Sequence, residues 1–343
     1  MDSRSVIGKS LYNLLELCSG NITFVEHNFY VRTTMKTSRR FSRGVLNHVY
    51  QRTVNGFVIF YCISDYLVYF TTLCVIAPKY RVKLLMVSLM PDHIHLGVIA
   101  DRAKDLSGFM QEVSKYFAFN HNEVCHHSGS LFQRPFGSAP KYGDKAVRTI
   151  LIYIANNGPE RKLVNNAEDY RWSFVAYAAS DHPFSEKLVI RRASSRMRRA
   201  LSEVKATYAK GRPMDYWQLK RLFSSLCRKE QEQLTDFIIN TYNVIDYKAA
   251  IRYFGDYDKM LLAMHSTTGS EYDINEVVVG KDDRCYANMT AICMKELRLK
   301  DIHDVLALDD EAKMEVFHLL NAKTDALLEQ ICAFLRIPFK KLK

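Results

Sequence analysis

The sequence lacks the features of a secreted or membrane-bound protein. Its 343 residues include eight cysteines, but no two form a C-x-x-C pair and no regular cysteine framework is visible. The first four residues lead into no apolar segment of a signal peptide. The most apolar stretch, 57–70, is interrupted by Asp65 and is too short to span a bilayer. We therefore expect a reduced, cytoplasmic protein with no membrane partner.

The sequence also lacks a recognisable zinc motif. Cys125, His126 and His127 are consecutive, and consecutive side chains do not converge readily on one ion. No second group of ligands follows them at the spacing of a zinc site. A zinc site at these three residues is therefore not predicted. We also find no internal repeat, no low-complexity tract and no nucleotide-binding loop.

What the sequence does have is apolar content and positive charge. Hydrophobic residues make up 48% of the chain, which is enough for packed cores, and the length fits two domains. The net charge is +11, which favours a polyanionic partner, with nucleic acid ahead of a membrane surface. Residues 185–225 hold eleven Lys or Arg and only three Asp or Glu. This segment is either a solvated helical face or a strip that lies along phosphates, and we favour the strip.

Hydrophobic periodicity predicts an α+β amino-terminal half. We expect strands and helices in the order β-α-β-β-α-β-α, which is the ferredoxin-like split βαβ plan with one added helix. The expected strands are 46–53, 82–89, 93–99 and 131–138, and the expected helices are 66–76, 106–120 and 145–156.

The chain divides into four parts by composition. We expect a basic lead-in at 1–43, a catalytic domain at 44–184, a basic helical linker at 185–225 and an all-helical domain at 226–343. Within the last part, helices near 311–320 and 325–335 form either a DNA-binding helix-turn-helix or an ordinary helical hairpin.

Two histidines of the third strand form an H-x-H pair. Because side chains alternate along a strand, His93 and His95 project from the same face, as two ligands of one metal must. Two hydrogen-bonded surface histidines are the plainer alternative. One turn apart on the last helix, Tyr153 and Asn157 share a face that can pack beside these histidines. Asn157 can then supply a third ligand, with Tyr153 next to the metal; an ordinary core tyrosine is the alternative.

Six motifs in a fixed order extend this pattern. They are Asn47-His48-Val49-Tyr50-Gln51-Arg52-Thr53, Leu89-Met90-Pro91-Asp92-His93-Ile94-His95-Leu96, Leu131-Phe132-Gln133-Arg134-Pro135-Phe136, Tyr153-Ile154-Ala155-Asn156-Asn157, Leu163-Val164 and Asp169-Tyr170-Arg171-Trp172-Ser173. Together they resemble the single-tyrosine transposases of the HUH superfamily, in particular those associated with repetitive extragenic palindromes. The resemblance covers about residues 44–178.

The resemblance implies a function for each matching residue. His93, His95 and Asn157 match the ligands of a divalent metal, Mg²⁺ or Mn²⁺, and Tyr153 matches the nucleophile that attacks DNA. The implied partner is single-stranded DNA that folds into hairpins, and the protein is either a monomer or a homodimer. Residues that we expect to contact this DNA are Gln133, Arg134, Arg148, Arg161, Lys162, Arg171 and Trp172.

The motifs depart from the family pattern at two places. Pro135 occupies the position where such enzymes have an arginine, with Arg134 just before it. After the tyrosine, proline and arginine are each shifted by one position, to Pro159 and Arg161. Because of these shifts, the resemblance does not assign particular phosphate contacts to Arg134 and Arg161. For Arg171 and Trp172, packing in the core of the domain is an equal alternative to DNA contact.

The predicted activity is cleavage and rejoining of single-stranded DNA through a 5′-phosphotyrosine intermediate. A catalytically silent, sequence-specific DNA-binding regulator derived from such a transposase is the alternative. Two other enzyme classes fit less well. A histidine-type phosphohydrolase usually has a third histidine where this chain has Gly97, and a replication or conjugation nickase is usually longer.

Overall fold

The computed structural model describes residues 39–133, 135–266 and 282–339. Most of the predicted basic lead-in lies outside the described residues, as does Arg134, one of the expected DNA contacts. All statements about the structure below concern the described residues.

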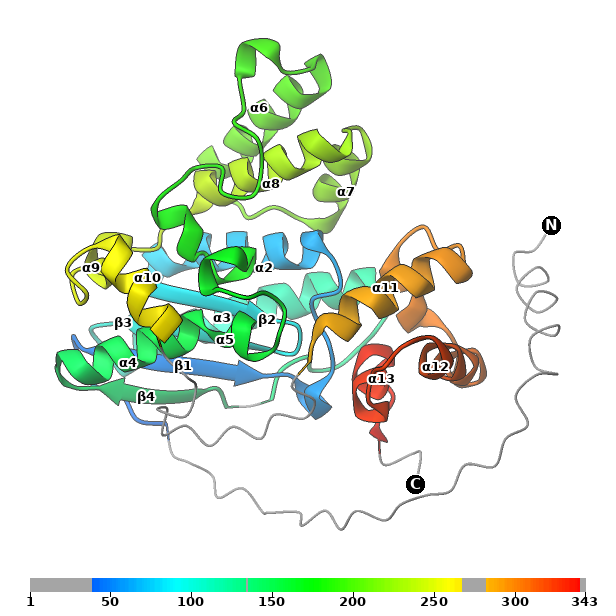
Figure 1. Cartoon of the computed structure of the whole chain (residues 1–343), viewed down its shortest axis with the longest axis horizontal. Helices are drawn as coiled ribbons and strands as arrows, with labels where there is room; N and C mark the ends of the chain where they lie inside the picture. Colours follow the sequence, from blue (N-terminus) through cyan, green and yellow to red (C-terminus); the bar gives the residue numbers. More distant parts are fainter. Residues whose placement is uncertain (1–38, 134, 267–281, 340–343) are drawn as a thin grey trace.

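The centre of the molecule is a four-stranded antiparallel sheet (Figure 1) with the strand order β2-β3-β1-β4. Its strands are β1 (Leu46–Arg52), β2 (Lys83–Met90), β3 (His93–Ile99) and β4 (Gly137–Lys141). Helix α2 (Ile63–Ile76) joins β1 to β2, and helix α3 (Ala103–Val124) joins β3 to β4. Helix α4 (Gly143–Ala155) follows β4. This order is the ferredoxin-like plan with one added helix, so the predicted fold class is confirmed.

The last strand of the sheet differs from its prediction. We expected it at 131–138, whereas β4 begins only at Gly137. Phe132 is buried but makes a single isolated bridge with Thr53 instead of joining a ladder. Leu131 and Phe132 therefore contribute to the core without forming a strand. Their hydrophobicity led to the wrong prediction that the strand begins at residue 131. β4 itself contains Pro140, which is tolerated because β4 lies at the edge of the sheet.

The two faces of the sheet have different coverings. Ile94, Leu96 and Val98 of β3 belong to the apolar core that also contains residues of α2 and α3. The alternate residues of β3 face α4. Gly97 lies on this second face, and a Cβ there would be 3.5 Å from Leu151 of α4. The face with the histidine pair is therefore the face that α4 covers.

Helices after residue 185 extend the opposite side of the molecule. Helix α8 (Arg228–Tyr242) packs on α2, helix α6 (Ser195–Ala209) packs on α8, and α7 (Tyr216–Ser224) also contacts α2. The basic segment 185–225 thus lies beyond α2, on the side of the sheet away from α4 (Figure 1). Two shorter helices, α9 (Tyr247–Ile251) and α10 (Tyr257–Ser266), return towards β2 and α4.

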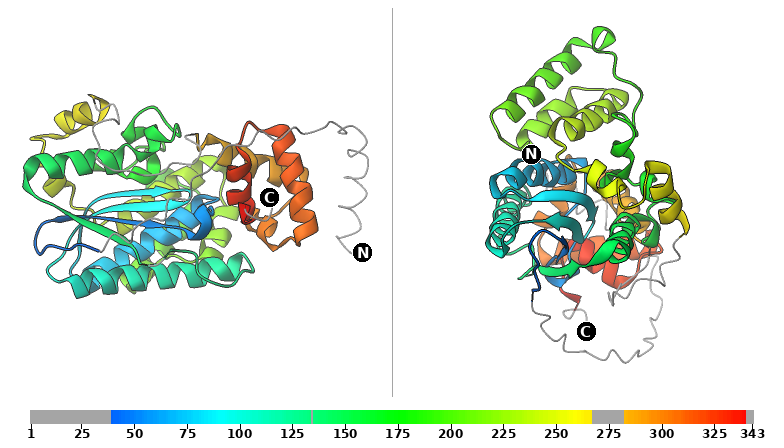
Figure 2. Two further views of the ribbon diagram at one scale, coloured as in Figure 1. Left: turned by 90° about the horizontal axis from the view of Figure 1, so that it is seen from below. Right: turned by 90° about the vertical axis from the view of Figure 1, so that its left-hand side faces the viewer.

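The carboxyl-terminal helices form a separate core at one end of the sheet (Figure 2). They are α11 (Arg284–Glu296), α12 (Asp310–Lys323) and α13 (Leu328–Leu335), with a 3-10 turn, η8 (Ile302–Ala307), between α11 and α12. This core meets the segment before α2: Tyr61 Oη donates to Phe334 O at 2.7 Å, and Arg336 Nη2 donates to Val58 O at 3.0 Å.

The helical nature of the carboxyl-terminal part agrees with the prediction. Helix α13 buries Ile331, Phe334 and Leu335, so its apolar face is used for packing. The DNA-binding role of α12 and α13 and the limits of the four parts stay predictions. None of the described helices is both long and apolar enough to cross a bilayer.

Candidate active site

The two histidines of β3 lie side by side under α4. Their ring centroids are 4.9 Å apart, and both side chains are buried. They project from one face because they are two residues apart on a strand, as predicted. The pair is therefore not the surface pair of the plainer alternative.

Asp92 fixes the orientation of His93. The Nδ1–H of His93 donates to Asp92 Oδ1 at 2.6 Å. Burial alone would raise the pKa of Asp92, but the charge and hydrogen bond of His93 lower this pKa to about 2. Asp92 is therefore a carboxylate at neutral pH, and it directs the other nitrogen of His93, Nε2, into the site.

A third histidine, His48 of β1, fixes His95. His48 Nε2 and His95 Nδ1 share a hydrogen bond of 2.9 Å, and the two rings stack. Burial lowers the pKa of His48 to about 3, with a smaller contribution from the charge of Lys141. Burial and the neighbouring His93 and His48 also hold the pKa of His95 well below its usual value. Both imidazoles are therefore neutral, which is the form that binds metals.

Tyr153 packs against these rings from α4. Its ring centroid is 5.3 Å from that of His95 and 5.7 Å from that of His48, in edge-to-face contacts. Only 5% of Tyr153 is exposed. The helix carries Tyr153 here because Val147, Ile150, Leu151 and Ile154 are buried on its inner side. The structure thus brings together Tyr153 and the histidine pair, which are far apart in the sequence.

Asn157 lies one turn after Tyr153, where α4 gives way to the short helix α5 (Asn157–Glu160). Its Nδ2 donates to Tyr153 O at 2.9 Å, and its side chain is buried. Because the amide nitrogen is used within the helix, Oδ1 is the atom of Asn157 that is suited to a cation.

Three buried polar atoms around this site have no hydrogen-bond partner among the described residues: His93 Nε2, Ser88 Oγ and Thr53 Oγ1. Ser88 lies opposite His95 in the ladder of β2 and β3. Buried polar atoms are nearly always paired in folded proteins. Their accumulation here indicates a place where a metal, water or phosphate completes the site.

A cavity of about 340 Å³ opens beside His93. Its catalytic-domain wall includes Arg52, Gln133 and Arg161, and its opposite wall includes Tyr286 and Gln330 from the carboxyl-terminal helices. Two arginines and one amide beside a metal-type histidine suit a phosphate-bearing ligand. Figures 1 and 2 show the carboxyl-terminal helices at this end of the sheet.

The part of the chain that carries this site matches a known protein family. Residues 64–157, which hold α2 to α4 with the histidine pair and Tyr153, match the family described as "Transposase IS200 like". This segment is similar to the IS200-like transposases. The predicted resemblance to single-tyrosine transposases is confirmed by this match. No curated protein matches the chain.

One solved structure is similar to part of this chain. It is described as the REP-associated tyrosine transposase bound to a REP hairpin, and it is 17% identical with a TM-score of 0.37. The similarity covers 47% of this chain and 98% of that chain.

The expected DNA contacts of the transposase domain are dispersed. Gln133 and Arg161 line the cavity beside His93, and Lys162 is exposed next to Arg161. Arg148 is half-buried and donates to Tyr253 O at 3.3 Å, so it helps to hold the chain after α9.

Arg171 and Trp172 take the packing role that was the alternative to DNA contact. Trp172 is 8% exposed and stacks on Tyr66 with a centroid separation of 4.2 Å. Arg171 pairs with Glu232 at 2.6 Å and with Asp236 at 3.4 Å, which ties the segment after α5 to α8. Neither side chain is part of the DNA surface that we propose below.

Sequence reasoning missed the residues that support the histidine pair. The motifs contain His48 and Asp92, which orient the pair, and Arg52, which lines the cavity, but sequence spacing assigns no role to any of them. The signal was the alternation of His48, Tyr50 and Arg52 along β1, which places all three on the same face as His95 once β1 pairs with β3. Strand pairing supplies that information, and sequence spacing alone does not.

Proposed function

We propose that this chain is a metal-dependent transposase that cuts and rejoins single-stranded DNA at hairpin-forming elements, with Tyr153 as its nucleophile. The observation that carries the proposal is the contact between the Tyr153 and His95 rings inside a segment of the IS200-like family. An ordinary core tyrosine packs among apolar side chains, whereas Tyr153 packs against two buried, neutral imidazoles, those of His48 and His95.

The residues present fit a divalent cation. His93 Nε2 is buried and unpartnered among the described residues, while its Nδ1 is held by a carboxylate, as is usual for metal-binding histidines. His95 and Asn157 Oδ1 would complete the ligand set. Two imidazoles and one amide oxygen suit Mn²⁺ better than Mg²⁺, which prefers oxygen. When bound, such an ion would stabilise negative charge on the scissile phosphate.

Tyr153 would carry out the bond exchange. Its phenol oxygen attacks phosphorus, the bond from phosphorus to the 3′ oxygen breaks, and the phenol proton is finally transferred to that oxygen. The products are a 5′-phosphotyrosine and a free 3′-hydroxyl. The new ester is close in energy to the old one, so a DNA 3′-hydroxyl can reverse the step and rejoin strands without another energy source.

The cavity beside His93 is the proposed path of the DNA backbone. Arg52, Gln133 and Arg161 line it together with Asp92 and Glu329, and the arginine and amide groups are the donors that suit phosphates. That the substrate folds into a hairpin is inferred from the sequence motifs. Action as a homodimer stays a prediction.

Covalent trapping tests the proposal. Single-stranded oligonucleotides with hairpins from beside the gene would be incubated with the protein and Mn²⁺, then resolved on denaturing gels. We expect a protein–DNA adduct that is absent in Tyr153→Phe and present in Tyr142→Phe, a control at the exposed tyrosine immediately before the same helix. An adduct that survives in Tyr153→Phe would exclude this nucleophile. Tight binding to these hairpins without any adduct would favour the regulator.

A further inference from the structure

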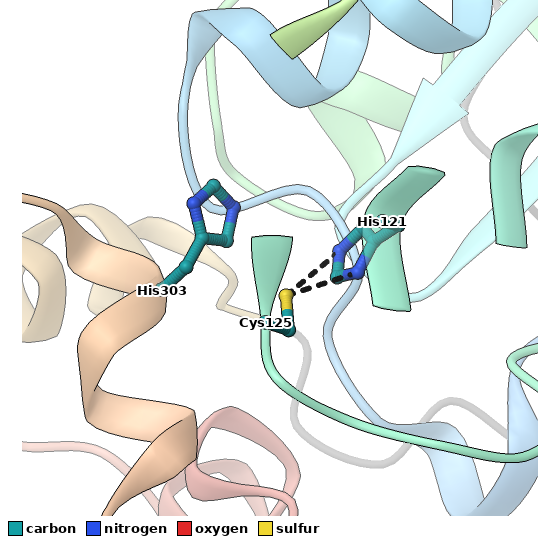
Figure 3. Close-up of side chains that lie close together, drawn as sticks. All are labelled: His121, Cys125 and His303. Carbon is teal, nitrogen blue, oxygen red and sulfur yellow. Dashed lines mark hydrogen bonds between the residues drawn. The ribbon is translucent and has the colours of Figure 1, made fainter. Parts of the chain in front are cut away.

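A second group of side chains that can bind a metal ion lies outside the candidate active site. His121 and Cys125 of the α3 end and His303 of η8 each offer a ligand atom, and these atoms lie within 4.8 Å of one another (Figure 3). All three residues are buried. Asp65 of α2 joins them, because its Oδ1 is 2.9 Å from His303 Nε2 and 3.9 Å from His121 Nε2.

The Nε2 atom of His121 is hydrogen-bonded to the backbone. His121 Nε2 lies 2.9 Å from Ile59 O, so it carries the proton and donates. The other nitrogen, Nδ1, therefore has its lone pair directed at Cys125, whose Sγ is 3.1 Å away. The four-residue spacing on a helix brings these two ligand atoms together. Metal-binding histidines typically donate their second N–H to a carbonyl in this way.

His303 shows the same arrangement with a carboxylate. Its Nδ1 donates to Asp301 Oδ1 at 2.7 Å, while its Nε2 points to Asp65. A carboxylate behind the second nitrogen is the usual support of a zinc-binding histidine.

Asp65 is held from behind as well. Its Oδ2 accepts from the backbone N–H groups of Tyr61 and Cys62 at 2.7 and 2.9 Å, and Tyr216 Oη donates to its Oδ1 at 2.7 Å. The second polar atoms of His121, His303 and Asp65 are thus engaged. The ligand atoms of His121, Cys125 and His303 lie close together, and Asp65 Oδ1 lies against His303. Cys62 and Asp65 both lie near His303, and we assign Asp65 as the fourth ligand because its Oδ1 is 2.9 Å from His303 Nε2; its 3.9 Å approach to His121 is to Nε2, the nitrogen held by Ile59.

We infer that His121 Nδ1, Cys125 Sγ, His303 Nε2 and Asp65 Oδ1 form a structural zinc site. Zinc prefers four ligands drawn from nitrogen, sulfur and carboxylate oxygen, whereas a thiolate does not suit Mg²⁺. Ligand atoms around tetrahedral zinc lie roughly 3.3–3.8 Å apart, so small side-chain movements suffice. Binding replaces the Asp65–His303 and His121–Cys125 hydrogen bonds and releases the two protons that these bonds hold.

The site would join two parts of the molecule. Asp65, His121 and Cys125 belong to the ferredoxin-like domain, whereas His303 belongs to the carboxyl-terminal helices. Zinc would therefore hold those helices at the end of the sheet, where they form one wall of the cavity beside His93. The inference does not depend on the proposed transposase activity.

Metal analysis of the full chain tests the inference first. The protein would be expressed with added zinc, purified under reducing conditions without chelator, and analysed by mass spectrometry of the elements. We expect one tightly held zinc per chain. The metal-free protein titrated with Co²⁺ should show the visible bands of a four-coordinate ion and a thiolate charge-transfer band.

Variants locate the ion. Cys125→Ser and His303→Gln should lose the zinc and the cobalt–thiolate band. Cys227→Ser, at an exposed cysteine, should keep both, as should the double variant His93→Ala, His95→Ala. If the His93, His95 variant lost the zinc while Cys125→Ser kept it, the ion would belong to the candidate active site and the inference would be wrong.

Wild-type measurements decide the matter even where a variant fails to fold. Removing zinc with a chelator should lower the melting temperature of the wild-type chain, and adding zinc back should restore it. Folded wild-type protein with no zinc and no cobalt–thiolate band would overturn the inference. The group would then be a buried hydrogen-bond network around Asp65.

Discussion

The candidate active site depends at the residue scale on how each histidine is oriented. His93 is held by Asp92 and His95 by His48, so each imidazole has one nitrogen fixed by a neighbour. Neither support follows from the H-x-H spacing, because Asp92 acts through a contact with the adjacent residue and His48 through strand pairing. The metal ligands were therefore predictable from the sequence, whereas the groups that orient them were not.

Replacing Asp92 should weaken metal binding without unfolding the chain. Asp92→Asn removes the carboxylate behind His93, and loss of such a support typically lowers metal affinity about 10- to 100-fold. The Mn²⁺ affinity of zinc-loaded protein, measured by calorimetry, checks this. Asp101→Asn, at an exposed acid after β3, is the matched control and should bind normally. Equal affinities in the two variants would mean that Asp92 does not support the site.

Asp283 should make stability depend on pH. Burial raises the pKa of this carboxyl to about 7, although the charge of Arg161 opposes the increase. The folded chain then keeps a proton that the unfolded chain loses, so stability falls as pH rises from about 4 to about 7. Relative to the parent, Asp283→Asn should gain roughly 1–3 kcal/mol of stability between about pH 5 and about pH 8. Thermal unfolding of both proteins at the two pH values measures this difference, and parallel pH profiles would contradict it.

At the scale of elements, the sequence predicted the sheet well except at β4. Strand β3 has the predicted limits, and β1, β2, α2, α3 and α4 lie where periodicity placed them, within a few residues. These elements have a clear apolar period, because each packs one face against a core. Leu131 and Phe132 are apolar for another reason: both are buried, and Phe132 makes only an isolated bridge with Thr53. Composition cannot distinguish such a core-filling loop from a strand.

A substitution at Trp172 tests whether the turn that holds it, after α5, packs in the core or contacts DNA. Its stacking on Tyr66 predicts that Trp172→Ala lowers the free energy of unfolding by about 3–5 kcal/mol. DNA affinity of the remaining folded protein should be unchanged. Trp217→Ala, at a 72% exposed tryptophan of α7, is the control and should change stability by about 0.5 kcal/mol or less. Reduced DNA affinity with normal stability in Trp172→Ala would restore the base-stacking prediction.

At the scale of the whole molecule, the basic helices and the proposed catalytic site lie on different sides of the sheet. The segment 185–225 lies beyond α2, whereas Tyr153 projects from α4 towards the other face of the sheet. Sequence analysis located the charge but not its side of the molecule, because that depends on how α6 and α8 pack. DNA held at Tyr153 would have to pass around the sheet to reach α6.

Charge reversal on α6 should therefore affect binding without affecting chemistry. Arg199 and Lys210 are exposed, and changing both to Glu should weaken DNA binding and reduce its salt dependence if the strip follows phosphates. At saturating DNA, the rate of adduct formation should equal that of the parent. The comparison is a single-turnover time course at several salt concentrations. A large loss of rate at saturation would place the strip in the cleavage site and contradict this arrangement.

The central claim, that Tyr153 is the nucleophile, is tested most directly by locating the DNA adduct in the chain. Trypsin should release residues 149–161 as one peptide, in which Tyr153 is the sole tyrosine. After reaction with a hairpin substrate and nuclease trimming, mass spectrometry should find this peptide with a nucleotide attached through a 5′ phosphate. A nucleotide on a different tyrosine peptide, or an adduct with no tyrosine linkage, would contradict the account.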